Sequence, residues 1–159
     1  MFSDREAIVK ESGVTQDSVV LEIGAGNGFL TEVLAQNAKK VYAVELQERM
    51  IRKLSKRVRK FGDRISIIKG DISSVRLRED CADIGILYYS FHEFEEKERA
   101  AYSIHHAVKK GGSVSIYEPT IEVGKKAMLR TSALFEERGF QKTKERCGFF
   151  TRFIRLEKT

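Results

Sequence analysis

Three glycines in a short loop are the first residues whose spacing could do chemistry. Gly24, Gly26 and Gly28 follow an apolar run at 19–23, and a helical pattern of apolar residues follows them at 29–37. A strand, a glycine turn and a helix in this order present backbone N–H groups and a helix N-terminus to a nucleotide-like ligand. The sequence therefore predicts a binding loop at this point.

Two acidic residues follow later apolar runs. Glu45 ends the second run, 21 residues after Gly24, and Asp71 follows the third run in the order Lys69-Gly70-Asp71-Ile72. At such a spacing a carboxylate can accept hydrogen bonds from both hydroxyls of a ribose. Because ligands in parallel α/β sheets bind beyond the carboxyl ends of the strands, the glycine loop, Glu45 and Asp71 are expected to line one crevice.

The elements that must position these residues alternate along the chain. Apolar runs of strand length lie at 19–23, 41–44, 65–68, 84–88 and 114–117. Apolar residues at helical spacing lie at about 3–12, 29–37, 47–60, 95–108 and 123–138. This alternation predicts a parallel sheet covered by helices on both faces, joined by right-handed crossovers.

Local signals suggest where two of these helices begin and end. Ser3 and Glu6 have the spacing of a capping box, so a short helix should begin there and stop at Gly13. The helix at 95–108 is expected to end in the turn at 109–112, with lysines in its last turn and two glycines as a stop.

The end of the chain breaks the alternation. Two strand-like segments, at 141–147 and 149–156, are separated by Gly148. Strands joined by so short a turn must be antiparallel. The sheet is therefore expected to be mostly parallel and to end in an antiparallel hairpin.

The glycines fall as G-x-G-x-G, with Glu22 two residues before the first. A dinucleotide site would need a small residue where Phe29 stands, because the helix there packs close to the strand. The arrangement instead resembles the class I S-adenosylmethionine-dependent methyltransferases. The resemblance covers nearly the whole chain, in the segments 22–28, 41–45, 70–71, 83–88 and 109–112 and in the terminal hairpin.

This resemblance implies a fold and a cofactor. The fold is a Rossmann-like, doubly wound α/β sheet of seven strands in the order 3-2-1-4-5-7-6, with strand 7 antiparallel and helices on both faces. The cofactor is S-adenosylmethionine, and methyl transfer leaves S-adenosylhomocysteine. Its methionine part would be wrapped by the glycine loop, which comprises Gly24, Ala25, Gly26 and Gly28.

The same resemblance assigns the other cofactor contacts. Glu22 would help to hold the ammonium group, often through water, and Glu45 would take the ribose hydroxyls. Asp71 would accept from the adenine amino group. The adenine ring would pack on apolar side chains, and the aromatic end of the fourth strand would form a pocket wall. These residues are Leu46 and Ile72 for the ring and Tyr88 for the wall.

Two possible methyl acceptors are disfavoured because the chain lacks the residues that they require. Residues 19–60 resemble ribosomal RNA adenine dimethyltransferases, but those enzymes carry an Asn-x-Pro-Tyr type motif after strand four. The corresponding segment here, 87–94, has neither Asn nor Pro, so adenine N6 is disfavoured as the atom that accepts the methyl group. Methylation at cytosine C5 needs a cysteine nucleophile near strand four or five, and Cys81 and Cys147 lie elsewhere.

Residues 90–94 look more like the small-molecule members of the superfamily, where strand four often runs into an aromatic residue and a histidine. His92 could deprotonate a hydroxyl or amine acceptor, since an unperturbed imidazole suits a base at neutral pH. Alternatively, His92 caps the next helix or is simply exposed. Methyl transfer from a sulfonium can also proceed by alignment alone.

Charge leaves two further functions open. Residues 49–64 carry eight basic side chains and one acid, and 125–159 carry ten basic and four acidic ones, on an otherwise acidic body. Such segments are either solvated faces or contacts for RNA. The alternatives to a small-molecule methyltransferase are therefore an RNA methyltransferase and a non-catalytic, cofactor-binding partner subunit.

Length and composition indicate what kind of protein carries this site. The 159 residues are expected to form one methyltransferase domain, 1–159, without a disulfide framework or metal site. No apolar stretch is long enough for a membrane span, and the free cysteines fit a cytoplasmic protein. The short connections around the acceptor side favour a large acceptor, or a homodimer that closes the pocket.

Overall fold

The computed structural model describes residues 5–159, so Ser3, the expected helix cap, lies outside the described part. The strands are β1 (Val19–Ile23), β2 (Lys40–Glu45), β3 (Ile65–Lys69), β4 (Ala82–Tyr88), β5 (Val108–Pro119), β6 (Phe140–Cys147) and β7 (Thr151–Lys158). The helices are α1 (Arg5–Glu11), α2 (Phe29–Asn37), α3 (Glu48–Val58), α4 (Lys97–Ala107) and α5 (Lys125–Glu136), with short 3-10 turns η1 (Arg59–Arg64) and η2 (Phe91–Glu93).

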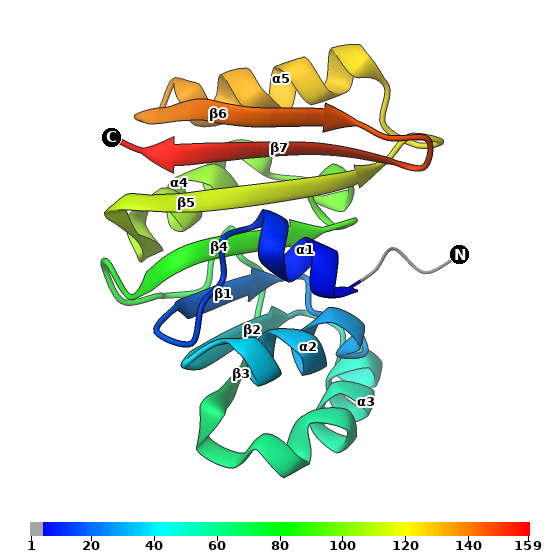
Figure 1. Ribbon diagram of the computed structural model, residues 1–159, viewed down its shortest axis with the longest axis vertical. Coiled ribbons are helices and arrows are strands. Elements are labelled where there is room, and N and C mark those ends of the chain that lie inside the picture. Colours follow the sequence, from blue (N-terminus) through cyan, green and yellow to red (C-terminus); the bar gives the residue numbers. More distant parts are fainter. Residues whose placement is uncertain (1–4) are drawn as a thin grey trace.

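The strands form one seven-stranded sheet in the order β3-β2-β1-β4-β5-β7-β6 (Figure 1). Neighbouring strands from β3 to β5 are parallel, whereas β7 runs antiparallel to both β5 and β6. The predicted strand order and the antiparallel seventh strand are therefore confirmed.

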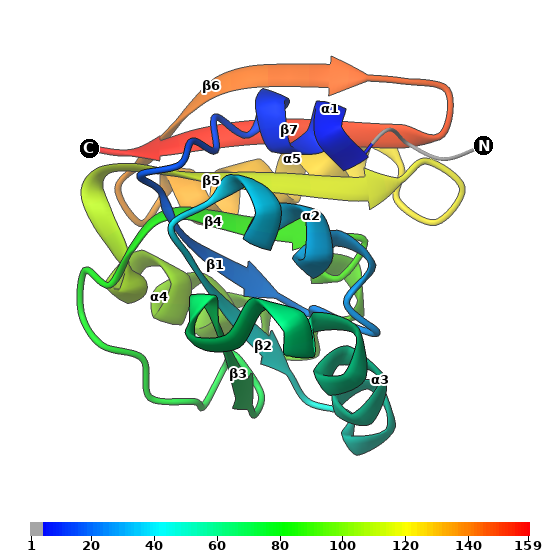
Figure 2. The same ribbon diagram turned by 60° about the horizontal axis from the view of Figure 1, so that its bottom comes forward.

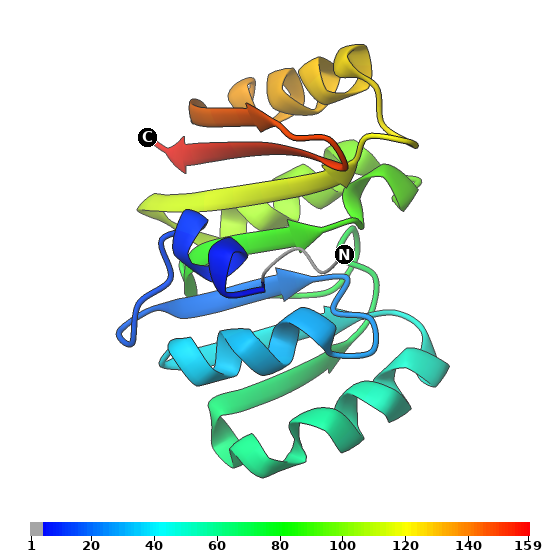
Figure 3. The ribbon, with the colours of Figure 1, turned by 45° about the vertical axis from the view of Figure 1, so that its right-hand side comes forward.

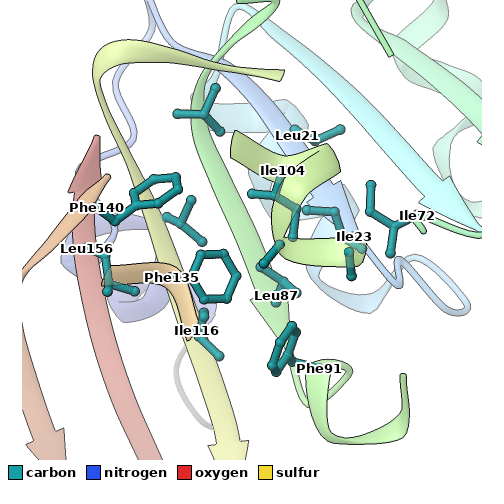
Figure 4. Packing of buried hydrophobic residues seen from close by; sticks show 14 of the residues in the cluster. Leu21, Ile23, Ile72, Leu87, Phe91, Ile104, Ile116, Phe135, Phe140 and Leu156 are labelled. Carbon is teal, nitrogen blue, oxygen red and sulfur yellow. The ribbon is translucent and has the colours of Figure 1, made fainter. Parts of the chain in front are cut away.

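Helices cover both faces of this sheet. Figures 1 and 2 show α1 and α2 in front of the sheet, while α4 lies behind it. Alternate residues of β1 divide between the faces: Val20 packs with the α1 and α2 side chains, and Leu21 and Ile23 pack with those of α4 and α5. Figure 4 shows this second cluster, in which Ile104 and Phe135 lie against the β4 and β5 side chains.

The parallel strands all end at one side of the sheet, as Figure 3 shows for β1, β4 and β5. We call this side the carboxyl edge. It carries the residues that follow β1, β2, β3, β4 and β5, and every residue predicted from the sequence to bind the cofactor or the acceptor lies in or beside it.

The predicted end of the fourth helix was wrong. α4 ends at Ala107, and Val108 already pairs with Ala82, so the lysines at 109 and 110 lie outside the helix. The chain then bulges before Ser113 pairs with Ile84. Gly112 is needed in this bulge, because a Cβ there would lie only 2.6 Å from a main-chain oxygen of residue 83.

The hairpin also differs in detail from the prediction. Its turn spans 148–150, so Phe149 and Phe150, expected in the last strand, lie outside it, and the Phe149 side chain is 87% exposed. Thr120, just beyond β5, donates from its N–H to the Phe150 carbonyl and from its hydroxyl to the Phe149 carbonyl. These two bonds fix the hairpin turn to the β5–α5 connection.

The predicted basic helix is divided. Leu54 and Val58 of α3 are buried against the sheet, while the helix ends at Val58 and continues as η1. The basic side chains of α3 are all exposed. In the described part of the chain, no helix is long and apolar enough to cross a membrane, and Cys81 and Cys147 are free thiols.

Candidate functional site

The glycine loop between β1 and α2 is held by its own main chain. Its three glycines have φ values of +77°, +59° and +90°, a region that side chains disfavour. The N–H groups of Gly24 and Ala25 both donate to the Val44 carbonyl of β2, and that of Gly28 donates to the Ala25 carbonyl. The loop therefore has few amides left to cradle a phosphate, which separates it from a dinucleotide site.

Gly24 is also required by close packing. A Cβ at this position would lie 2.6 Å from the Ser90 Cβ, and the Ser90 hydroxyl donates to the Ile23 carbonyl at 2.9 Å. Around Gly26, by contrast, no described atom lies within 4 Å of an added Cβ. The loop thus packs against the end of β4 on one side and faces open space at its centre.

Glu45 connects the end of β2 to this loop. Its side chain is nearly buried, and its two oxygens accept from the N–H groups of Gly26 and Gln47, each at 2.8 Å. Each carboxylate oxygen can accept more than one hydrogen bond. Glu45 can therefore hold the loop and still accept from ligand hydroxyls, which is what a ribose would need.

Glu22, near the end of β1, is a buried acid of the site, with 2% of its surface exposed. Its carboxylate accepts from the Thr31 hydroxyl of α2. Burial raises its pKa from 4.5 to about 8, although the Thr31 hydrogen bond opposes the rise and the nearby Glu45 adds to it. A ligand ammonium reaching this carboxyl would supply the positive charge that the described residues do not.

The two residues after β3 lie differently from each other. Asp71 is exposed, and its Oδ1 accepts from the N–H and the hydroxyl of Ser73, both at 2.8 Å. Ile72 is buried in the core, where Figure 4 shows it close to Ile23. Leu46, 58% exposed, offers the open apolar surface beside Glu45.

Aromatic side chains form the end of β4. Tyr88 stacks on Tyr89, with ring centroids 4.2 Å apart, and also contacts the Tyr117 ring of β5. Tyr89 has a φ of +58°, which is unusual for a bulky residue, and its N–H donates to the Tyr117 carbonyl. Its hydroxyl contacts that of Thr151, so the hairpin reaches the same part of the carboxyl edge.

His92, in η2, lies between two carboxylates. Its Nδ1 is 3.0 Å from Glu118 Oε1, at the end of β5, and its Nε2 is 2.7 Å from Glu122 Oε2, in the β5–α5 connection. Burial alone would lower the pKa of His92, but both carboxylates outweigh it and raise the pKa above its ordinary value. Burial raises the pKa of Glu118 as well, while its contact with His92 opposes this.

His92 was predicted from the sequence as a site residue, whereas Glu118 and Glu122 were not. A signal was present, since both acids follow the fifth strand and His92 follows the fourth. Pairing of Tyr88 with Tyr117 brings these two strand ends together. Among the described residues, the carboxyl edge therefore contains one more group of ionisable side chains than was predicted.

The molecule also has a groove beside α5. A volume of about 370 Å³ lies between α5 and the β6–β7 hairpin, lined by residues such as Met128, Arg152 and Ile154. None of the residues predicted to bind the cofactor lines it. The glycine loop, Glu45 and His92, which the sequence predicted as site residues, lie instead at the carboxyl edge.

The sheet order, the antiparallel seventh strand and the glycine loop with Glu45 define a Rossmann-like methyltransferase. The described residues fit S-adenosylmethionine, since the loop is open at Gly26, Glu45 retains acceptor capacity, and the amides that would bind a pyrophosphate are occupied.

The sequence agrees with this class. The methyltransferase domain family matches residues 21–116, so the chain belongs to that family. This confirms the predicted class I methyltransferase family and S-adenosylmethionine as the cofactor of the class.

Individual proteins support the same assignment. The chain is 31% identical to an uncharacterized methyltransferase of Geobacillus sp. over 91% of its own length and 62% of that protein. It is 44% identical to a probable ribosomal RNA small subunit methyltransferase A of Methanosarcina barkeri, over 54% of this chain and 29% of that one. The chain thus spans less than two thirds of these relatives.

A solved structure shares the fold. A SAM-dependent methyltransferase from Aquifex aeolicus superimposes with a TM-score of 0.86 and 21% identity, covering 98% of this chain and 90% of that one. At this identity the likeness supports the fold alone, and the confirmed strand order agrees with it.

Proposed function

We propose that the chain transfers a methyl group from S-adenosylmethionine to a small molecule bearing an O–H or N–H group, and that His92 accepts the proton of that group. The sulfonium of the cofactor supplies an electrophilic methyl carbon. The observation that carries the proposal is the position of His92 at the carboxyl edge, with both ring nitrogens in contact with carboxylates.

The cofactor contacts of this proposal follow the described geometry. Glu45 accepts from the ribose hydroxyls while it holds the loop through Gly26, and Leu46 covers the adenine ring. Asp71 accepts from the adenine amino group, and Glu22 receives the ammonium group. Ile72 is buried in the core and supports the adenine-binding surface from below. Tyr88, stacked on Tyr89, forms the wall of the pocket.

The connection between the two halves of the site supports a role for His92. Ser90 lies two residues before His92 and hydrogen-bonds to the end of β1, directly before the glycine loop. An acceptor bound beside η2 therefore lies next to the loop that wraps the methionine part of the cofactor. Proximity and alignment of this kind supply a large part of the rate of a displacement reaction.

Charge at the acceptor side favours a small molecule over RNA. Glu93, Glu118 and Glu122 all lie within 4 Å of the His92 ring nitrogens. Phosphate groups of a nucleic acid would be repelled there, because like charges at short range are unfavourable. The basic side chains of α3 lie on a helix that leads away from β2.

RNA remains the second candidate for one reason. Relatives that resemble about half of this chain are ribosomal RNA small subunit methyltransferases, including the one from M. barkeri. The chain spans only 29% of that relative, and its own segment 87–94 lacks the Asn and Pro of the adenine-N6 motif. The exposed cations of α3 would provide the phosphate contacts in this case.

The test is a methyl-transfer screen. The purified protein is incubated with S-adenosylmethionine labelled in the methyl group, together with a metabolite panel or with total RNA. We expect label in the small-molecule fraction. His92→Ala should lower turnover by about 10²–10⁴-fold, while His106→Ala, a histidine outside the site, should not.

Three results would contradict the proposal. Label found only in RNA would establish the second candidate. A His92→Ala rate close to that of the wild type would remove His92 as the proton acceptor. Binding of S-adenosylhomocysteine without transfer to any acceptor would indicate a non-catalytic partner subunit.

A further inference from the structure

The two carboxylates that face His92 impose a protonation state on it. Nδ1 lies 3.0 Å from Glu118 and Nε2 lies 2.7 Å from Glu122. A neutral imidazole has only one N–H, so it can donate to one of these oxygens and must direct a lone pair at the other. The imidazolium, with two N–H groups, can face both, and a third carboxylate at 3.9 Å, that of Glu93, favours the charge further.

The two carboxylates differ in their surroundings. Glu118 belongs to β5 and is 1% exposed, so its position is fixed by the sheet. Glu122 lies in the connection between β5 and α5 and is 59% exposed. Its oxygen is close to Nε2 but not aligned with the ring N–H, and Nε2 is a buried atom with no hydrogen-bond partner among the described residues. The Glu122 contact is therefore the one that a ligand can replace.

One cation opposes this cluster. Lys97, from α4, donates to the main-chain carbonyls of His92 and Phe94. Its ammonium is thus held by the backbone, close enough to lower the pKa of Glu118, and three carboxylates outnumber it. Among the described residues, no other charged group forms an ion pair with the His92 side chain.

We propose that Glu122 holds His92 in its imidazolium form in the acceptor-free protein, and that it must leave Nε2 before His92 can act as a base. Glu118 is the positioning residue, which keeps the ring oriented through Nδ1. The acceptor is thus a molecule whose own O–H or N–H takes the place of Glu122. This inference rests on the proposed function.

The proton and electron balance of the step is simple. As Glu122 leaves, His92 loses its Nε2 proton to solvent and the neutral ring keeps its N–H toward Glu118. The acceptor oxygen or nitrogen then forms a bond to the methyl carbon while the carbon–sulfur bond breaks and its electron pair passes to sulfur. The acceptor proton moves to Nε2 and is later released to water.

The first test needs neither an acceptor nor activity. The imidazole proton signals of the three histidines are titrated by NMR in the wild type and in Glu122→Gln, with His105 and His106 as internal references. We expect His92 in Glu122→Gln to lose its proton at lower pH than in the wild type. Glu98→Gln, an exposed change on α4, should leave the His92 titration unchanged.

The same experiment can overturn the inference. An identical His92 titration in the wild type and Glu122→Gln would mean that Glu122 does not hold the proton. Because Glu122 is exposed, the variant should fold, which an unchanged amide spectrum outside this loop would verify. Glu122→Ala is a second variant with the same expected direction.

The second test uses the acceptor that the methyl-transfer screen yields. The acid limb of kcat/KM should move to lower pH in Glu122→Gln, so that below this limb the variant is faster by about tenfold for each pH unit of movement. Glu118→Gln should lower kcat at every pH, with little change in KM. An unmoved acid limb in Glu122→Gln would contradict the inference.

The two proposals fail in different ways. If His92 titrates as expected but no acceptor is methylated, Glu122 does hold the proton of His92 and the proposed function is wrong. If transfer occurs and depends on His92, but Glu122→Gln changes neither the titration nor the acid limb, the function stands and the role of Glu122 is wrong.

Discussion

Replacing Glu22 by Gln should stabilise the protein, and should do so only above a certain pH. The side chain is buried against α2, where it accepts from the Thr31 hydroxyl, and burial raises its pKa from 4.5 to about 8. Below pH 4.5 the carboxyl is protonated in both the folded and unfolded chains, so the variant and the wild type should differ little. Between these two pH values only the unfolded chain loses the proton.

The size of the effect follows from this difference in proton affinity. The wild type loses up to about 1.4 kcal/mol of unfolding free energy for each pH unit between 4.5 and 8. The full difference approaches about 5 kcal/mol at pH 8 and above, as an upper limit. Gln has the same shape and a carbonyl that can accept from Thr31, but it does not ionise, so the variant escapes the loss.

Urea denaturation at pH 5, 6, 7 and 8 measures the effect. The difference in unfolding free energy between Glu22→Gln and the wild type should grow steadily with pH. Glu79→Gln makes the same chemical change at an exposed position and should give a constant difference near zero. A pH-independent difference for Glu22→Gln, or a variant less stable than the wild type at pH 8, would refute the reasoning.

Three further outcomes are expected. Glu45→Ala should weaken the binding of S-adenosylmethionine and S-adenosylhomocysteine at least about tenfold, since charge-assisted hydrogen bonds are worth roughly 1.5–3 kcal/mol. Calorimetry measures this loss, and equal binding by the variant and the wild type would contradict the ribose contact. Gly24→Ala should lower the unfolding free energy by about 1–3 kcal/mol in urea, because φ is +77° and the new Cβ would meet Ser90; an unchanged midpoint would be inconsistent with this packing. Charge reversal on the basic surface of α3 and η1 should leave cofactor affinity nearly unchanged, whereas loss of RNA methylation in the same variant would favour the second candidate. The residues to reverse are Lys56, Arg59 and Lys60.

Much of the fold could be predicted because local signals and tertiary contacts agree. The bounds of β1 and α2 coincide with the prediction, since the glycine loop separates an apolar run from an amphipathic helix. The end of α4 was missed because Val108 leaves the helix to pair with Ala82. That contact joins two strands that are distant in sequence, and the residue types near position 108 do not indicate it.

The hairpin shows a similar conflict between local preference and tertiary contact. Phe149 and Phe150 favour strands, so the pattern placed them in one. Thr120 instead binds their carbonyl groups and draws them into the turn. The partner residue lies about 30 positions away in sequence, beyond any local window.

Part of the candidate site could likewise be predicted from the sequence, and part of it could not. Glu45 and the glycine loop could be predicted from spacing because both belong to consecutive strand ends. The carboxylate partners of His92 depend on the register of β4 against β5, which the sequence alone leaves open. The protonation of Glu22 likewise depends on the depth of its burial under α2, which its residue type does not reveal.

The bonds from Thr120 to the hairpin turn have a consequence for how such a protein can diversify. They involve the main-chain oxygens of residues 149 and 150, and not their side chains. Phe149, Phe150 and Ile121 are all exposed beside this junction, next to Glu122. Their size and polarity can therefore change while the backbone of the segment that carries Glu122 keeps its conformation. Evolution can in this way alter the surface that an arriving molecule meets without disturbing the histidine and its carboxylates.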